Sequence, residues 1–176
     1  MKIIIMCAGR SKRFGTHRPK PLALVEGVPN CVRTWNLVHE LTQTCSYLTV
    51  NKDRKNYFDV LDQPIQSYLI VGDSQRETQR YSNAFPLSGE TVFLYGDVIY
   101  SIEDLSLILS QVETTTWYGR IGSNPVTGKK CDELMGVHVI DYLKFEDAVK
   151  EVDRQMKERE KENKQLVGMY TRYTKD

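Results

Sequence analysis

Short apolar runs alternate with polar, glycine-containing stretches along the chain and predict alternating strands and helices. Residues 2–8 are apolar on both faces, which is typical of a central strand in a parallel sheet. Further strands are predicted at 46–51, 67–72, 91–97, 114–121 and 134–140. Helices are predicted at 30–44, 57–61, 74–85, 101–112 and 141–165.

Polar residues mark the starts of several predicted helices. Asn30 is predicted to cap the helix at 30–44, with Cys31, Trp35, Val38 and Leu41 or Cys45 forming its apolar stripe. Ser74 with Glu77, and Ser101 with Asp104, have the spacing of capping boxes. The last two strands are predicted to pair antiparallel. The order predicts an α/β fold in one domain over 1–176, a three-layer sandwich with a mostly parallel mixed sheet and a charged C-terminal helix.

Composition narrows the classes of protein that fit. The 176 residues are 40% hydrophobic and 27% charged with a formal net charge of +1, so bulk charge supports no general affinity for nucleic acid or anionic membranes. The apolar start at 3–8 is too short to span a membrane and lacks the cleavage site of a signal peptide. The four cysteines (Cys7, Cys31, Cys45 and Cys131) show no metal-ligand spacing, which predicts buried thiols in a cytoplasmic protein.

A basic segment directly follows the first predicted strand. Between Gly9 and Lys20 there is no acidic residue, and the next carboxylate is Glu26. The segment contains the basic residues Arg10, Lys12, Arg13, Arg18 and Lys20, and also His17. Ligands of open α/β sheets bind at the carboxyl ends of strands, where glycine amides and basic side chains can hold phosphate. An anion site is favoured over the alternative, a solvated basic loop.

The segment is neither of two common phosphate loops. The pattern GxxxxGK[ST] is absent, and Gly9 is followed by Arg10 and Ser11 rather than by the spacing GxGxxG. Instead, "CAGRSKRFGTHRPKPLALVEGVP" resembles the signature of nucleotidyltransferases with the glycosyltransferase-A-like fold, including the sugar-1-phosphate and phosphocholine nucleotidyltransferases. The matching positions are Ala8, Gly9, Arg13, Pro19, Lys20, Leu22, Gly27 and Pro29, whereas Ser11 replaces the second glycine of the signature.

The resemblance implies roles for these residues and a nucleotide-diphospho-sugar transferase-like fold. The segment Ala8, Gly9, Arg10, Ser11, Lys12 and Arg13 would surround the nucleotide. Arg13 would hold the phosphates that leave as pyrophosphate, and Lys20 would stabilise charge at the reacting centre. Both are therefore expected to be catalytic. Cations aimed at developing charge are what such a reaction requires.

Two later segments extend the resemblance. Asp97 follows an apolar strand in "VFLYGD", where the family has an aspartate that binds Mg²⁺. The preceding helix implies base contacts by Gln75, Thr78 and Ser82, although an amphipathic helix with capping residues explains them equally well. In "CDELMGVHVID", Glu133 and Gly136 would contact the acceptor. His138 is expected to be structural, because a lone histidine in a strand is more often so.

The resemblance departs from the family near the end of the chain. Members of the family usually have a second metal-binding Asp or Asn late in the chain. It has no clear counterpart here, since Asp141 and Asp153 lie in or near a charged helix and match poorly. That helix, 141–165, has one apolar stripe, which could pack on the domain or pair with a second subunit in a homodimer.

The function implied is Mg²⁺-dependent transfer of a nucleoside monophosphate from a nucleoside triphosphate to a phosphorylated small-molecule acceptor. The acceptor would be a sugar-1-phosphate or of phosphocholine type, with no nucleic acid or membrane partner. A molybdenum-cofactor or isoprenoid-type nucleotidyltransferase and a non-catalytic nucleotide-binding module are the alternatives. A sugar-transferring glycosyltransferase is disfavoured, because "GDV" supplies one acid where D-x-D is required.

Overall fold

The computed structural model describes residues 1–9, 18–44, 46–59, 61, 68–71, 81, 89–123, 128 and 130–173, with the backbone alone described at 68–71, 121, 123, 130–132 and 161–173. The strands are β1 (Lys2–Met6), β2 (Leu24–Val25), β3 (Val28–Pro29), β4 (Ser46–Asn51), β5 (Tyr68–Val71), β6 (Thr91–Tyr95), β7 (Thr116–Ser123) and β8 (Lys130–Val139). The helices are α1 (Asn30–Thr42), α2 (Asn56–Asp59), α4 (Ile102–Ile108) and α5 (Tyr142–Tyr173), with short 3-10 turns η2 (Lys20–Leu22) and η3 (Lys52–Arg54).

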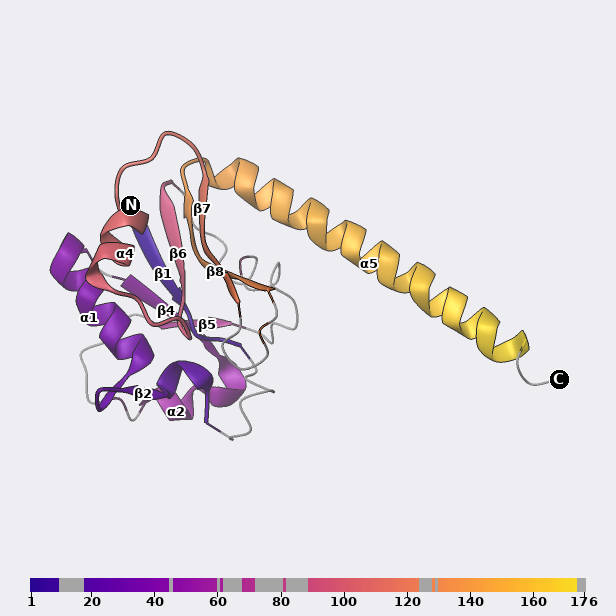
Figure 1. Ribbon diagram of the computed structural model, residues 1–176, viewed down its shortest axis with the longest axis horizontal. Coiled ribbons are helices and arrows are strands. Elements are labelled where there is room, and N and C mark those ends of the chain that lie inside the picture. The colour runs from indigo at the N-terminus through magenta and orange to yellow at the C-terminus, as the bar shows by residue number, and fades with distance from the viewer. Residues whose placement is uncertain are drawn as a thin grey trace.

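The main sheet has the strand order β5-β4-β1-β6-β8-β7 (Figure 1). Strands β5, β4, β1 and β6 run parallel, whereas β8 runs antiparallel to both β6 and β7. The prediction of a mostly parallel mixed sheet that ends in an antiparallel pair is therefore confirmed. The carboxyl ends of β1, β4 and β6 meet at one edge of this sheet, which is the edge where ligands bind in open α/β folds.

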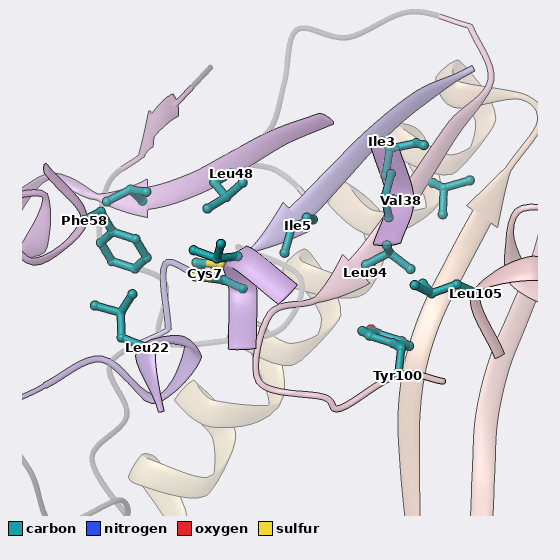
Figure 2. Packing of buried hydrophobic residues seen from close by; sticks show 14 of the residues in the cluster. Ile3, Ile5, Cys7, Leu22, Val38, Leu48, Phe58, Leu94, Tyr100 and Leu105 are labelled. Atoms are coloured by element: carbon teal, nitrogen blue, oxygen red, sulfur yellow. The ribbon is translucent and has the colours of Figure 1, made fainter. Parts of the chain in front are cut away.

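Alternating side chains of β1 pack into two separate hydrophobic cores, one on each face of the sheet, as its doubly apolar pattern predicted. Ile3 and Ile5 pack with side chains of α1 and α4 on one face of the sheet (Figure 2), and Ile4 lies on the other face with Phe145 of α5. The pleat of a strand sends successive side chains to opposite faces, so helices on both faces produce the predicted three layers. Each of these fully buried isoleucines stabilises the fold by about 1.5–3 kcal/mol.

The start of α1 differs from the prediction. Asn30 is the first residue of the helix rather than its cap, because Pro29 holds the N-cap position and no side chain caps the helix. Cys31 and Val38 of the predicted stripe are buried, but Leu41 is exposed. The helix ends where Gln43 adopts a left-handed conformation with a φ of 52°. The amide of Asn30 is buried and makes tertiary contacts instead of a cap.

Two other predicted helix starts have different outcomes. Ser101 and Asp104 form the predicted capping box, with both reciprocal hydrogen bonds at 3.1 and 3.2 Å. The box at Ser74 and Glu77 lies outside the described residues, as does most of the helix predicted at 74–85. Within that segment the structure describes Tyr81, whose ring is buried in the second core.

A short hairpin, β2–β3, was not predicted. Glu26 and Gly27 form its turn with φ angles of 52° and 82°, so two successive residues are left-handed, as a type I′ turn requires. The hairpin connects η2 to the start of α1, and its signal in the sequence was "EG" between two valines.

Helix α5 is longer than predicted. It spans 32 residues, or about 48 Å, and its distal part extends away from the body of the molecule (Figure 1). Its first turns are anchored by the buried side chains of Tyr142, Phe145 and Val149. Among the helices in the described ranges, none is long and apolar enough to cross a bilayer.

Candidate functional site

Two of the predicted site residues meet at the carboxyl edge of the sheet. Lys20 Nζ lies 2.9 Å from Asp97 Oδ2. Lys20 comes from η2 and Asp97 from the turn after β6, and the two side chains are 46% and 37% exposed. Because both charged groups remain open to solvent, a ligand can reach either of them. A cation and a carboxylate therefore stand side by side at the edge of the sheet where a phosphate ligand would bind.

The position of Lys20 is set by the residues around it. Pro19 and Pro21 are buried, and the amides of Leu22 and Ala23 donate to the carbonyls of Pro19 and Lys20, each at 3.0 Å. Leu22 is fully buried in the first core, which it shares with Cys7 and Phe58 (Figure 2). The buried side chain of Leu22 thus anchors the turn in the core, while the lysine side chain stays on the surface. Pro19 and Pro21 also restrict the backbone on either side of Lys20, because the proline ring fixes φ.

Asp97 is brought to the site by a close approach of two chain segments. The amide of Gly96 donates to the carbonyl of Met6 at 3.1 Å, which joins the end of β6 to the end of β1. A Cβ at position 96 would lie 2.5 Å from Cys7 Sγ and 3.0 Å from the Met6 carbonyl oxygen. Only glycine fits this position without displacing its neighbours, so the G-D pair is a packing requirement as well as a motif.

The side-chain amide of Asn30 braces the same turn from α1. Its Nδ2 donates to the carbonyls of Gly96 at 3.1 Å and of Val98 at 2.8 Å. These acceptors lie on either side of Asp97, and Asn30 itself is 2% exposed. The amide therefore holds the backbone that carries the carboxylate. Sequence reasoning missed this role, because a polar residue at a helix start predicts a cap.

The hydroxyl of Tyr100 links the end of β6 to β8 through backbone groups of Tyr95 and Met135. It accepts a hydrogen bond from the Tyr95 amide at 2.8 Å and donates toward the carbonyls of Tyr95 and Met135. Burial raises the pKa of Tyr100 well above its ordinary value, and the charges of Asp97 and Asp104 add to this effect. The hydroxyl consequently stays protonated and able to donate. No motif in the sequence singled out this residue.

The thiol nearest the site is not set up as a nucleophile. Cys7 and Cys31 are both buried and free, as predicted. Burial raises the pKa of the Cys7 thiol, and its contact with Cys31 and the charge of Asp97 raise it further. The thiol therefore remains protonated. Cys45 and the side chain of Cys131 lie outside the described residues.

Much of the predicted nucleotide site falls outside the described residues. Ala8 and Gly9 come directly after β1, at the same sheet edge as Asp97. The other nucleotide-site residues predicted from the sequence are not described: Arg10, Ser11, Lys12, Arg13, Gln75, Thr78 and Ser82. Their contacts with a nucleotide stay predictions.

The two predicted acceptor residues differ in exposure. Gly136 pairs with Leu94 and is buried in the sheet, where a Cβ would lie 2.9 Å from the Phe93 carbonyl oxygen. Glu133 is exposed, and the antiparallel register carries it past the end of β6 toward the edge that holds Asp97. Glu133 is thus accessible at the same edge of the sheet as Asp97. Gly136 instead allows β6 and β8 to approach each other.

The remaining polar candidates lie elsewhere. His138 pairs with Val92 near the amino end of β6, is fully buried, and has its two ring nitrogens 3.0 Å from the Ile108 carbonyl oxygen and 2.8 Å from Glu90 Oε1. Asp141 follows β8 at that same edge, and Asp153 pairs with Lys157 on α5. None of the three lies beside Asp97, in agreement with the poor match of Asp141 and Asp153 to a metal ligand and with the structural role expected for His138.

Asp97 could hold part of a metal site. Among the described residues, no three acidic, histidine or cysteine side chains converge on one point. Mg²⁺, however, is commonly bound by one or two carboxylates with substrate phosphates completing its shell. The exposed carboxylate of Asp97, already paired with the ammonium group of Lys20, is a donor of the right chemistry for that arrangement.

Comparison with known proteins places the fold. The sequence matches no family model, and no curated protein matches it. Among solved structures, a putative glucose-1-phosphate thymidylyltransferase from Bacillus anthracis, in complex with a sucrose, matches with a TM-score of 0.58 at 16% identity, covering 81% of this chain and 72% of that one.

Two further structures match at similar levels. HddC from Yersinia pseudotuberculosis complexed with GMP-PN gives a TM-score of 0.55 at 14% identity, covering 83% of this chain and 79% of that one. The inositol-1-phosphate CTP transferase from T. maritima gives 0.55 at 12% identity, covering 79% and 70%. The protein therefore has the predicted nucleotidyltransferase-like α/β fold, which these three solved structures share. At such low identity the likeness concerns the fold alone.

Proposed function

We propose that the protein is a nucleotidyltransferase that transfers a nucleoside monophosphate from a nucleoside triphosphate to a phosphorylated acceptor and releases pyrophosphate. The observation that carries this proposal is the pairing of Lys20 with Asp97 at the carboxyl edge of the sheet, beside the end of β1. The fold shared with solved nucleotidyltransferases supports the same reaction class.

In the proposed reaction, an oxygen of the acceptor phosphate attacks the α-phosphorus of the triphosphate. The new P–O bond forms as the bond to the β-phosphate oxygen breaks, and pyrophosphate leaves with that electron pair. Negative charge grows on the α-phosphoryl oxygens and on the leaving group. Lys20 is suited to stabilise the first of these, because its ammonium group is exposed on a turn that is held rigidly from beneath.

The basic segment after β1 would supply the rest of the nucleotide site. Ala8, Gly9, Arg10, Ser11, Lys12 and Arg13 are proposed to surround the nucleotide, with Arg13 on the departing phosphates. Gln75, Thr78 and Ser82 are proposed to contact the base. A segment with five Lys or Arg residues, one histidine and no acid is electrostatically suited to a triphosphate.

Asp97 is the residue proposed to hold Mg²⁺. The ion, when bound, would neutralise phosphate charge and fix the orientation of the triphosphate. The chain contributes the carboxylate and the braces around it: Asn30 on the flanking carbonyls and Gly96 against Met6. These contacts preorganise Asp97 before any ligand arrives.

The acceptor is proposed to be a sugar-1-phosphate or a phosphocholine-like compound. Glu133 is exposed at the edge of the sheet that carries Asp97. There its carboxylate could accept hydrogen bonds from a hydroxylated acceptor. Gly136 is also proposed to contact the acceptor, in the part of β8 that approaches β6 closely.

The test combines four nucleoside triphosphates, Mg²⁺ and a panel of phosphorylated acceptors, with pyrophosphate release as the readout. The panel includes sugar-1-phosphates, phosphocholine, an isoprenoid-precursor phosphate and the molybdenum-cofactor precursor. Release that requires an acceptor and is lost in Asp97→Asn supports the proposal. Nucleotide binding by calorimetry without turnover on any acceptor would instead indicate a nucleotide-binding module.

A further inference from the structure

An open apolar groove, which neither Lys20 nor Asp97 lines, lies between the first half of α5 and the adjacent sheet surface. Its volume is about 1070 Å³, and its apolar lining includes Trp117, Leu134, Phe145, Val149, Val152 and Met156. Three of these side chains face solvent to a large extent: Trp117 is 53% exposed, Val152 47% and Met156 42%. A groove of this size with exposed aromatic and aliphatic walls is typical of an interaction surface.

Helix α5 carries a heptad pattern that runs past this groove. Phe145, Val149, Val152 and Met156 follow one another at alternating spacings of four and three residues. The same spacing continues through Arg159 and Asn163, and then through Leu166, Tyr170 and Tyr173. The first residues of this seam pack on the sheet, while the backbone beyond them extends away from the body (Figure 1). Apolar residues repeated at these positions predict a helix that packs along its whole length.

The order of residues along the seam is self-complementary. If two copies of α5 are aligned antiparallel about Lys161, each seam residue of one copy meets a defined seam residue of the other. The pairs are Arg159 with Asn163, Met156 with Leu166, Val152 with Tyr170 and Val149 with Tyr173. Each pair lies at equal distances along the chain from Lys161. Two copies aligned antiparallel about this point would therefore match apolar residues with apolar residues and the two polar residues with each other.

We propose that α5 pairs antiparallel with α5 of a second copy of this chain, and that the distal apolar segment of each helix occupies the groove of its partner. The register places the segment from Leu166 to Tyr173 of one copy along Val149, Val152 and Met156 of the other. Those three residues line the groove, so the seam and the groove specify the same occupant. The occupant is an amphipathic helix with apolar residues at heptad spacing, which α5 itself provides.

Charge near the centre of the seam favours the antiparallel orientation. In the antiparallel register the Arg159 of each copy stands opposite Asn163 of the other, so the two arginines are kept apart. Parallel pairing would instead place the two Arg159 side chains opposite each other, burying like charges. The outer face of the described part of α5 is compensated within the helix, since Lys150 pairs with Glu146 and Arg154 with Glu151 and Glu158.

The oligomeric state of the full chain is the first test, measured by sedimentation equilibrium across a range of concentrations. The expected result is a mass of two 20.4 kDa chains for the wild type. Val152→Gln with Met156→Gln should weaken the dimer at least about tenfold, because glutamine is a good helix former but does not fill an apolar seam. Lys150→Gln with Lys157→Gln, on the outer face of the same helix, is the matched control and should remain dimeric. A single-chain mass at all concentrations, or equal behaviour of the two double variants, would overturn the proposal.

Disulfide trapping tests the orientation and the register. Met156→Cys and Leu166→Cys are prepared separately, and wild type under the same oxidant serves as the background. Antiparallel pairing predicts that the mixed pair forms a crosslinked dimer, whereas either variant alone does not exceed the background. Crosslinking of Met156→Cys alone would indicate a parallel or different pairing and contradict the proposed register. Neither experiment depends on enzymatic activity, so the outcome is independent of the proposed function.

Discussion

The ammonium group of Lys20 lies 2.9 Å from a carboxylate oxygen of Asp97, although the two residues are 77 positions apart in the chain. Both side chains are partly exposed, so the pair contributes little to stability, because exposed ion pairs are worth at most about 1 kcal/mol. Four predictions follow from this site and from α5.

Replacing Lys20 should separate activity from stability. Lys20→Ala is expected to lower pyrophosphate release by about 10²–10³-fold, since it removes a cation aimed at developing negative charge. The free energy of unfolding should change by less than about 1 kcal/mol. A control is Lys144→Ala, because Lys144 forms an exposed ion pair with Asp141, which follows β8 at the opposite edge of the sheet. Near-normal turnover in Lys20→Ala would show that the site is assigned wrongly.

Replacing Gly96 should destabilise the fold through a steric conflict. A methyl group there would meet Cys7 Sγ and the Met6 carbonyl, so Gly96→Ala is expected to lower the free energy of unfolding by about 1–3 kcal/mol. Gly122→Ala is the control, because a Cβ at that position meets nothing closer than 3.7 Å. Chemical denaturation measures both variants. Combining Gly96→Ala with Cys7→Ala should recover part of the loss, and strictly additive losses would contradict the proposed clash.

Removing the amide of Asn30 should loosen the turn that carries Asp97. Asn30→Ala leaves the carbonyls of Gly96 and Val98 without this donor, at an expected cost of about 1–3 kcal/mol in the free energy of unfolding. Asn30→Asp should cost more, because a carboxylate would then face two carbonyl oxygens. Asn36→Ala, on the exposed side of α1, is the control. Equal stability of the Asn30 and Asn36 variants would exclude a bracing role.

The carboxylate of Glu151 on α5 should titrate at unusually low pH. Hydrogen bonds from Arg154 and then from Gln155 lower the pKa of Glu151 from 4.5 to about 2. Its contribution to helix stability is therefore fully present above pH 4.5 and is lost as the pH falls toward 2. NMR titration of the carboxyl group should give a midpoint that rises toward 4.5 in Arg154→Gln. High salt should raise it as well, because the group is exposed. An unchanged midpoint in Arg154→Gln would contradict the assigned cause.

Local patterns were sufficient to predict most of the architecture. The doubly apolar run at 2–8 predicted a central strand because a strand buried on both faces must be apolar at every position. The box of Ser101 and Asp104 was predictable because its two hydrogen bonds join residues three apart in the chain. The β2–β3 hairpin was missed because Glu26 occupies a left-handed position usually held by asparagine, aspartate or glycine.

The sequence by itself determined the order along the chain of the strands of the main sheet, the basic segment after β1, and the identities of Lys20 and Asp97 as candidate site residues. Tertiary structure alone decided how those residues are held. Asn30 stabilises the turn around Asp97 instead of capping α1, because its partners, Gly96 and Val98, are distant in the chain. Tyr100 links Tyr95 to Met135, which lie on two different strands. Hydrogen bonds of this kind leave no periodic signal. They form only when the folded sheet brings segments from separate elements together.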